Sequence, residues 1–240
     1  YQGSGRSNGM FVRDGVRSAM AAPVRERGEV VGSLVVATHV GGRRYSRAER
    51  EVLLAFAEHA SLALTDARTV GDAMHHAFHD SLTGLPNRVL LLDRLAQALA
   101  RAARAGTDVA VLFLDLDGFK TVNDSLGHAA GDELLEAVGA RIASCVRGGD
   151  TAARFGGDEF AVLLEGANDA EVAVAAQRIL GSLADPFAIA GREVFVSASI
   201  GIAVGSDESD DMLRNADLAL YRAKAEGRRS LVIVVSLHSD

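Results

Sequence analysis

The feature that most constrains the fold is an almost continuous apolar run over residues 109–116, in which Asp115 is the one charged residue. A run of this length that is apolar at successive positions is typical of a strand buried on both faces in the middle of a sheet. Asp115 and Asp117 lie at its carboxyl end, where a buried carboxylate is costly unless a positive group pairs with it. We therefore expect a central strand that carries acidic side chains at its end.

Helix and strand patterns alternate along the chain from Asp80 onwards. Helices are predicted over residues 89–105, 132–146, 168–183 and 210–226, and strands over residues 151–155, 158–164, 187–189, 193–204 and 231–235. The order α-β-α-β-β-α-β-β-α-β predicts an α/β sandwich with antiparallel hairpins. Neither G-x-G-x-x-G nor a P-loop is present, which argues against a Rossmann or P-loop fold.

The first part of the chain predicts a hairpin followed by a long helix. Residues 18–25 and 29–38 are β-prone and are separated by three turn residues. Ser46, with Glu49 three residues later, is a capping box that begins the helix. Its apolar residues are then spaced alternately three and four apart, at Leu53, Phe56, Ala60, Ala63, Ala67, Val70, Met74 and Ala77.

That spacing is the a/d pattern of a two-helix coiled coil, and it predicts a homodimer through this N-terminal helix. The alternative is a helix that packs on its own domain, and up to about Leu64 we expect such packing as well.

Composition and charge exclude several classes of protein. A formal net charge of −7 argues against a nucleic-acid-binding protein, and no apolar run approaches the ~18 residues of a membrane span. Cys145, the single cysteine, falls on the apolar face of a predicted helix, so we expect a core residue in a cytoplasmic protein. Because the sequence begins at Tyr1 rather than Met, we expect a piece of a longer chain.

The basic residues are unevenly divided between arginine and lysine. Of the 25 basic residues all are arginine except Lys120 and Lys224. A lysine ammonium is a compact point charge, so a crowded phosphate site can require it where the planar arginine fork does not fit. Because only two lysines are involved, chance is a competing explanation for this uneven use.

A second acidic cluster follows a pair of glycines. Gly156-Gly157 between two predicted strands indicates a two-residue turn in which both positions have positive φ, and it allows a ligand to approach the backbone closely. Asp158 and Glu159 follow directly. One alternative is that these two acids are simply solvated at the tip of the turn. For Asp117, the alternative is that it caps the turn that follows the central strand. If the hairpin lies beside the Asp115 strand, Asp158 and Glu159 could instead complete one site for a hard cation such as Mg²⁺.

Several of these segments resemble one family. The chain is similar to the GGDEF domains of diguanylate cyclases over about residues 80–235. The resemblance is carried by Asp80-Ser81-Leu82-Thr83-Gly84-Leu85-Pro86-Asn87-Arg88, Phe113-Leu114-Asp115-Leu116-Asp117-Gly118-Phe119-Lys120, Asn123-Asp124, Gly127-His128 through Gly131-Asp132, Gly156-Gly157-Asp158-Glu159-Phe160, Ser199-Ile200-Gly201 and Ala216-Asp217 through Tyr221-Arg222-Ala223-Lys224. It implies a ferredoxin-like or adenylyl-cyclase-like sandwich with a central mixed sheet over residues 80–236.

The resemblance also implies a reaction and a metal site. Members of the family join two GTP molecules into cyclic di-GMP and release two pyrophosphates. Asp115, the carbonyl of Leu116 and Asp158 would hold Mg²⁺ or Mn²⁺. Glu159 would lie at the same metal or help to deprotonate the attacking 3′-hydroxyl. Asp158, Glu159 and Lys120 are thus the expected catalytic residues.

The same resemblance assigns the groups that bind the nucleotide. Asn123 and Asp132 would recognise the guanine edge, and Gly156 and Gly157 would let the substrate approach. Three cations would bind the phosphates: Lys120, Lys224 and Arg228. Because one domain binds one GTP, two domains must face each other, and a dimerising helix would place them so.

The sequence from Arg147 to Asp150 resembles the family's product-inhibition site. Arg147 and Asp150 have the R-x-x-D spacing, and five residues separate Asp150 from Gly156. Arg178 matches a second arginine that a neighbouring domain adds. Cyclic di-GMP bound there would hold two domains in a non-facing arrangement. The alternative is an ordinary helix C-terminus, with Arg147 on the last carbonyls and Asp150 solvated.

Residues 1–66 resemble part of a GAF sensor domain, which leaves residues 67–79 as a coiled-coil linker. Two functions other than catalysis stay open. One is a catalytically silent module that binds GTP or cyclic di-GMP and passes on a signal. The other is a purely structural dimerisation domain.

Overall fold

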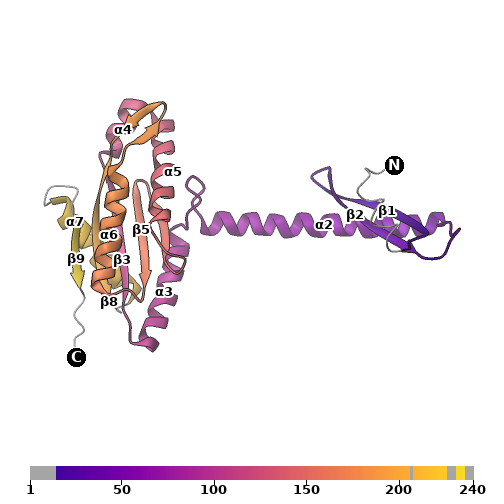
Figure 1. The fold of residues 1–240 in the computed structure, drawn as a ribbon, viewed down its shortest axis with the longest axis horizontal. Helices are drawn as coiled ribbons and strands as arrows, with labels where there is room; N and C mark the ends of the chain where they lie inside the picture. Colours follow the sequence, from indigo (N-terminus) through magenta and orange to yellow (C-terminus); the bar gives the residue numbers. More distant parts are fainter. Residues whose placement is uncertain (1–14, 206–207, 226–230, 236–240) are drawn as a thin grey trace. The chain divides into compact units, whose positions relative to one another are not determined.

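The computed structural model describes residues 15–205, 208–225 and 231–235 (Figure 1). The chain divides between Met74 and His75 into two compact units. No helix in these described ranges is long and apolar enough to cross a membrane.

In the first unit, β1 (Ser18–Glu26) pairs antiparallel with β2 (Glu29–Thr38), as predicted. The turn is formed by Arg27 and Gly28, both with positive φ, as a two-residue hairpin with right-handed twist requires. The helix α2 (Arg47–Phe78) begins with the predicted capping box. Ser46 Oγ accepts from the Glu49 amide at 3.2 Å, and the Ser46 amide donates to a Glu49 carboxylate oxygen at 2.8 Å.

The described part of α2 packs on the hairpin through a narrow face. Leu53 and Ala57 are buried against Ala22 and Val24 of β1, which confirms the predicted packing of the helix within its own unit. Leu53 is therefore covered by the hairpin and is not available for the predicted coiled-coil seam. Phe56, the next seam position, is 63% exposed.

The second unit is built on a five-stranded sheet. Its order is β4-β5-β3-β8-β9, with every neighbouring pair antiparallel except β8 and β9, so the predicted mixed sheet is confirmed. The strands are β3 (Val109–Asp117), β4 (Thr151–Gly156), β5 (Glu159–Glu165), β8 (Ser197–Gly205) and β9 (Leu231–Val235). A separate small hairpin pairs β6 (Phe187–Ile189) with β7 (Arg192–Val194).

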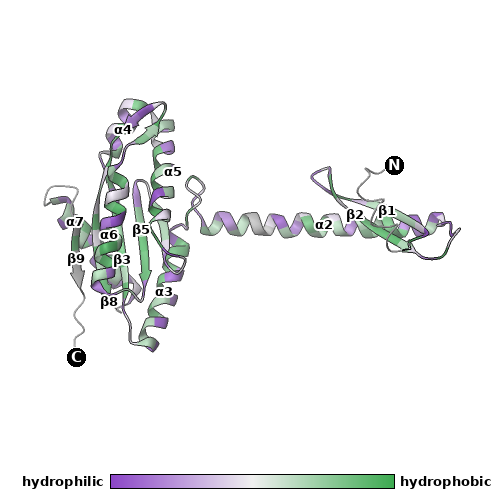
Figure 2. Cartoon of the chain, in the orientation of Figure 1, coloured by the Kyte–Doolittle hydropathy of each residue, from purple (hydrophilic) through white to green (hydrophobic). Residues whose placement is uncertain are grey.

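Helices cover both faces of this sheet. The helices of the unit are α3 (Arg88–Ala105), α4 (Phe119–Leu126), α5 (His128–Ser144), α6 (Asp169–Ala184) and α7 (Ser209–Ala225). One hydrophobic cluster joins the sheet to α3 and α7, and another joins it to α5 and α6. Figure 2 shows β3 and β5 hydrophobic along most of their length, as strands between two helical layers must be.

The alternation of side chains along β3 decides where its acids lie. Val111 and Phe113 belong to the cluster beneath α3 and α7, whereas Leu112 and Leu114 belong to the cluster beneath α5 and α6. Because successive side chains of a strand point to opposite faces, Asp115 falls on the α3/α7 side.

Gly201 on β8 allows α7 to lie close to the sheet. A Cβ at this position would overlap the backbone of Ala216 and Leu220 on α7. The glycine of the Ser199-Ile200-Gly201 motif is therefore required by helix–sheet packing.

Two predictions of secondary structure were wrong. The short helix α4 was not expected, because it has only eight residues and its N-cap residue, Gly118, provides no side-chain cap. The single strand predicted over residues 193–204 is divided into β7 and β8, with Phe195 and Val196 in neither. Cys145 is buried in the core, as predicted.

Candidate active site

The register of the central strands brings the two acidic segments together. Asp115 on β3 lies directly opposite Glu159 on β5. The backbone amide of Leu116 donates to the carbonyl of Asp158 at 3.3 Å. The hairpin thus lies beside the Asp115 strand, as the metal-site hypothesis required.

The turn that carries Asp158 differs by one residue from the predicted Gly156-Gly157 turn. Gly156 is still paired with Glu159, and the turn positions are Gly157 and Asp158. A bulge at Phe155, between Arg154 and Gly156, adds one residue to β4 and causes the offset. Of the two turn positions only Gly157, at φ +52°, has the left-handed conformation.

Lys224 supplies the positive partner that a buried carboxylate requires. Its Nζ atom lies 2.7 Å from Oδ2 of Asp115, whose side chain is 15% exposed. Burial raises the pKa of Asp115 above its ordinary value, and Lys224 opposes that rise. The neighbouring negative charges of Asp158 and Asp117 raise the pKa of Asp115 further.

The charged form of Glu159 is disfavoured in the same way as that of Asp115. Burial raises the pKa of Glu159, and the charges of Asp115 and Asp158 raise it further. Lys224 opposes this rise, while Asp217 on α7 adds to it. The cluster therefore has more negative charge than one lysine balances, and an added cation would stabilise it.

The donor set fits a hard divalent cation that shares its ligands with a substrate. Among residues 15–205, 208–225 and 231–235, no three His, Cys, Asp or Glu side chains form a complete metal site. Mg²⁺ commonly uses one or two protein carboxylates and takes its remaining ligands from water and phosphate oxygens. Asp115 and Asp158 are suitable for this kind of binding.

Asp117 has a structural role that was not predicted. Its carboxylate accepts from the hydroxyl of Ser197 at 3.0 Å and from that of Ser199 at 3.1 Å, both on β8. Both of these bonds run to β8 rather than to the turn that follows β3. Asp117 instead links β3 to β8 beside the acidic cluster.

The residues expected to read guanine lie at the junction of α4 and α5. Asn123 packs directly on Gly131, because a Cβ on Gly131 would overlap its Oδ1 atom. Asp132, the next residue, is exposed. Lys120 is exposed in the first turn of α4 and lies on the same side of that helix as Asn123, three residues on. Arg228 lies outside the described residues.

A cavity of about 380 Å³ opens beside Glu159 on the α3/α7 side, and sequence reasoning did not find it. Phe155 lines it, with the Arg88 guanidinium 4.7 Å from the centre of the Phe155 ring. Asp217 lies on its α7 wall. Arg88 and Asp217 both belong to the GGDEF motifs quoted above. Their presence there was the sequence signal that could have indicated this cavity.

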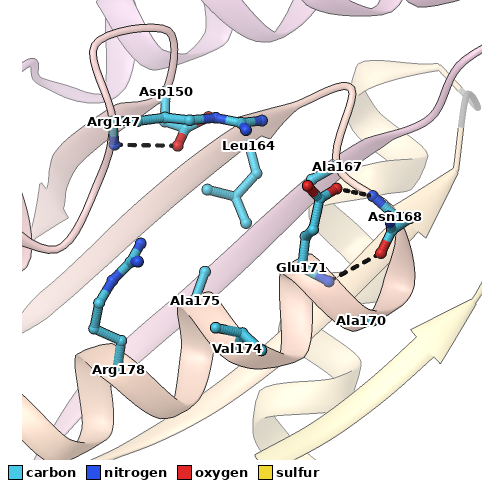
Figure 3. A pocket seen from close by; sticks show the side chains of 10 residues that line it. All are labelled: Arg147, Asp150, Leu164, Ala167, Asn168, Ala170, Glu171, Val174, Ala175 and Arg178. Carbon is cyan, nitrogen blue, oxygen red and sulfur yellow. Dashed lines mark hydrogen bonds and ion pairs between the residues drawn. The ribbon is translucent and has the colours of Figure 1, made fainter.

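The three residues of the expected inhibitory site line one cavity of about 410 Å³ (Figure 3). Arg147 and Asp150 come from the loop between α5 and β4, and Arg178 points towards that loop from α6. The cavity lies at the opposite end of the β4–β5 hairpin from the Gly157 turn, on the α5/α6 side of the sheet.

The contacts within this cavity contradict the alternative of an ordinary helix C-terminus. The Asp150 side chain is 3% exposed and accepts from Arg147 Nε and from the Glu165 amide, each at 3.4 Å, so it is not solvated. Arg147 donates to the Glu165 carbonyl at 2.9 Å rather than to the end of α5. It is Arg178 that donates to the carbonyl of Cys145 at that helix end.

Comparison with known proteins identifies the second unit. A family model described as "Diguanylate cyclase, GGDEF domain" matches residues 77–230. The chain belongs to the GGDEF family. A GAF domain model matches residues 4–64, so the resemblance of the first part to a GAF domain is confirmed as well.

Two curated relatives come from Pseudomonas aeruginosa. The bifunctional diguanylate cyclase/cyclic di-GMP phosphodiesterase MucR is 47% identical over 170 residues, which cover 70% of this chain and 25% of MucR. The diguanylate cyclase TpbB is 45% identical over 161 residues, which cover 65% of this chain and 37% of TpbB. The chain thus matches between a quarter and somewhat over a third of the length of these relatives.

Solved GGDEF structures share the fold. The isolated GGDEF domain of TpbB has a TM-score of 0.63 at 44% identity, covering 65% of this chain and 93% of that one. The coiled coil and GGDEF domain of DgcB from Caulobacter crescentus, in complex with c-di-GMP, has a TM-score of 0.69 at 27% identity. That match covers 79% of this chain and 100% of the DgcB chain. The predicted GGDEF sandwich is confirmed.

Proposed function

We propose that this GGDEF protein is a diguanylate cyclase that condenses two GTP molecules into cyclic di-GMP and two pyrophosphates. The observation that carries the proposal is the pairing of Asp115 with Glu159 across β3 and β5, with Lys224 at 2.7 Å from Asp115. Opposed acids with one lysine form a site that accepts both a divalent cation and a nucleoside triphosphate.

Asp115, the Leu116 carbonyl and Asp158 would hold Mg²⁺ or Mn²⁺. When bound, the cation would stabilise the negative charge that develops on the oxygens of the α-phosphate. The raised pKa of Asp115, caused first by burial, supports this assignment because a nearby cation would favour the ionised carboxylate.

Each half of the reaction makes one bond to phosphorus and breaks one, and it transfers one proton. The 3′-hydroxyl oxygen of one GTP bonds to the α-phosphorus of the other, and the bond from that phosphorus to the bridging oxygen breaks. Pyrophosphate leaves with the electron pair. Glu159 accepts the hydroxyl proton, and burial raises its pKa towards the neutral range in which a general base is most effective.

The remaining residues bind and select the nucleotide. Asp132 accepts from guanine N1 and N2 hydrogens that adenine does not offer, so ATP is expected to be a poor substrate. Asn123, packed on Gly131, contributes the second contact to the base. Lys120, Lys224 and Arg228 bind the phosphates, and the backbone at Gly156 and Gly157 leaves room for them.

Two features of the assembly belong to the same proposal. Two copies dimerise through α2, which brings two GTP-loaded domains face to face. Cyclic di-GMP binds at Arg147, Asp150 and the Arg178 of another domain, and holds the domains apart. The cavity that Arg147 and Asp150 line supports a ligand site on this face of the domain.

The test is product formation by two single variants. Asp158→Ala and Glu159→Ala are expected to lower the rate of cyclic di-GMP formation about 10²-fold or more, because charge stabilisation in the transition state is lost. Both residues lie at or beside the turn, so the melting temperature should be retained. Glu193→Ala, at an exposed acid on β7, is the control.

Near-normal turnover in both variants would contradict the assignment. GTP binding by the wild type without any turnover would instead support the signalling-module alternative.

A further inference from the structure

One arginine side chain joins two distant segments of the GGDEF unit. Arg154 Nη1 donates to Oδ1 of Asp80 at 3.0 Å, across 74 positions of sequence. Its Nε and Nη2 atoms donate to the carbonyl of Gly157 at 3.1 and 2.8 Å. The Arg154 side chain is only 13% exposed. A single planar guanidinium therefore connects the opening motif to the turn that carries Asp158.

The Asp80 end of this bridge is held firmly. The same Oδ1 atom accepts from the amide and the hydroxyl of Thr83, both at 2.8 Å. The amide of Asp80 donates to the carbonyl of Leu85 at 2.8 Å and so closes the turn between them. Burial disfavours the charged form, but the hydrogen bonds from Thr83 and Arg154 outweigh it and lower the pKa of Asp80.

The turn is also bonded to the last residues of α2 within the same unit. The Asn87 side chain donates to the carbonyl of Ala77, and its amide donates to that of Phe78, both at 2.9 Å. The backbone amide of Arg154 donates to the carbonyl of Pro86 at 3.0 Å. Hydrogen bonds thus run without a gap from the end of α2, through residues 80–87, to Arg154 and Gly157.

The Gly157 end needs such a support. Gly156 and Gly157 have no side chains to pack. Glycine also leaves the backbone more conformational freedom than any other residue type does. The next residue, Asp158, is an expected metal ligand, and Glu159 faces Asp115. The two charge-assisted hydrogen bonds from Arg154 to the Gly157 carbonyl fix the direction of the turn.

We propose that Arg154 is a positioning residue, which holds the Gly157–Asp158 turn in catalytic register and couples it to the segment that follows α2. The proposal rests on the proposed function, because register has a measurable meaning only if the site turns over GTP. A displacement of about 1 Å at a reacting group can cost about 10²-fold in rate.

The test compares three variants with the wild type by kinetics. Arg154→Met is expected to lower kcat about 10- to 100-fold with the KM for GTP within about twofold, since the nucleotide contacts are untouched. Asp80→Asn should lower kcat in the same way. The double variant should be no slower than the slower single variant, because both changes break one connection.

Arg101→Met is the matched control. It breaks another arginine–carboxylate contact of the same unit, between Arg101 and Glu165 at 2.7 Å, away from the turn. Its kcat should match the wild type. Multiplicative losses in the double variant, or a loss confined to KM, would overturn the proposal.

Hydrogen exchange gives a readout that does not depend on activity. In Arg154→Met the amides of residues 156–159 should exchange faster, while Arg101→Met leaves them unchanged. Unchanged protection of these amides in Arg154→Met refutes the bridge. A wild type without turnover refutes the proposed function but leaves this measurement decisive for the bridge. If Arg154→Met does not fold, Arg154→Lys, whose single ammonium cannot fork to both partners, replaces it in every comparison.

Discussion

Lys224 on α7 forms an ion pair with Asp115 at the end of β3, at an Nζ–Oδ2 distance of 2.7 Å. The two residues are far apart in sequence, and one of only two lysines in the chain is used for the contact. Burial raises the pKa of Asp115, and Lys224 limits that rise. The pair thus favours the ionised form of a buried carboxylate at the place where the proposed reaction needs it.

Replacing Lys224 with methionine tests this relationship. The pKa of Asp115 should rise further without the ammonium, so the acidic limb of the pH–rate profile should move to higher pH. Turnover near neutral pH should fall about 10²-fold. Arg222→Met, at an exposed cation of the same helix, is the control. An unmoved acidic limb with near-normal turnover would remove Lys224 from the site.

Gly131→Ala tests the guanine-binding junction. The added Cβ would displace the Asn123 side chain, so the KM for GTP should rise about 10-fold, the effect of one lost hydrogen bond to the base. Gly181→Ala is the matched control, because a Cβ there meets no atom within 4 Å. Equal KM values for the two variants would show that Asn123 does not contact the nucleotide.

Arg147→Ala tests product inhibition. The wild type should lose activity when micromolar cyclic di-GMP is added, whereas Arg147→Ala should be active and insensitive. Arg147 is a better choice than Asp150, because the buried Asp150 carboxylate also accepts from the Glu165 amide and its loss would disturb the fold. Equal inhibition of wild type and Arg147→Ala would place the inhibitory site elsewhere.

The stability of the GGDEF unit should depend on pH through Asp80. Burial disfavours its charged form, but bonds from Thr83 and Arg154 lower its pKa when folded, so the stabilisation is present above the unfolded pKa of 3.8. It is lost as pH falls through the folded pKa.

Urea denaturation measures this effect. At pH 7, Asp80→Asn should lower the free energy of unfolding by about 1–3 kcal/mol, the range for hydrogen bonds to charged groups. The two proteins should converge as the pH falls below 3.8. A difference that stays constant down to low pH would show that the ionised carboxylate is not responsible.

Met74→Glu tests the dimer seam of α2. Met74 occupies a seam position and is 61% exposed, and Leu62, off the seam, is exposed by the same 61%. Facing glutamates repel, so Met74→Glu should dissociate the dimer in sedimentation and lower activity most at low protein concentration. Leu62→Glu should do neither. Identical sedimentation of both variants would exclude this seam.

The central strand and its acids could be predicted because local pattern decides them. The apolar run identified β3 and placed Asp115 at its carboxyl end. Helix α4 was missed because Gly118 provides no side-chain cap, and the turn was misplaced by one residue because a bulge at Phe155 depends on pairing with β5.

The long-range contacts could not be derived in this way. The bond between Arg154 and Asp80 joins residues 74 positions apart, and no periodicity or turn rule specifies it. The same holds for the hydrogen bonds that the Asp117 carboxylate accepts from two serine hydroxyls on β8. The uneven use of lysine did point to Lys224, although its partner was not predicted.

The most direct test is to incubate the chain with Mg²⁺ and GTP at increasing protein concentration, with ³²P at the α-phosphate in one reaction and at the γ-phosphate in a parallel one, and to separate the products by chromatography. The account predicts cyclic di-GMP and pyrophosphate in a ratio of one to two, with a specific rate that rises with protein concentration as domains pair. The absence of cyclic di-GMP at every concentration, in a chain that binds GTP, would contradict it.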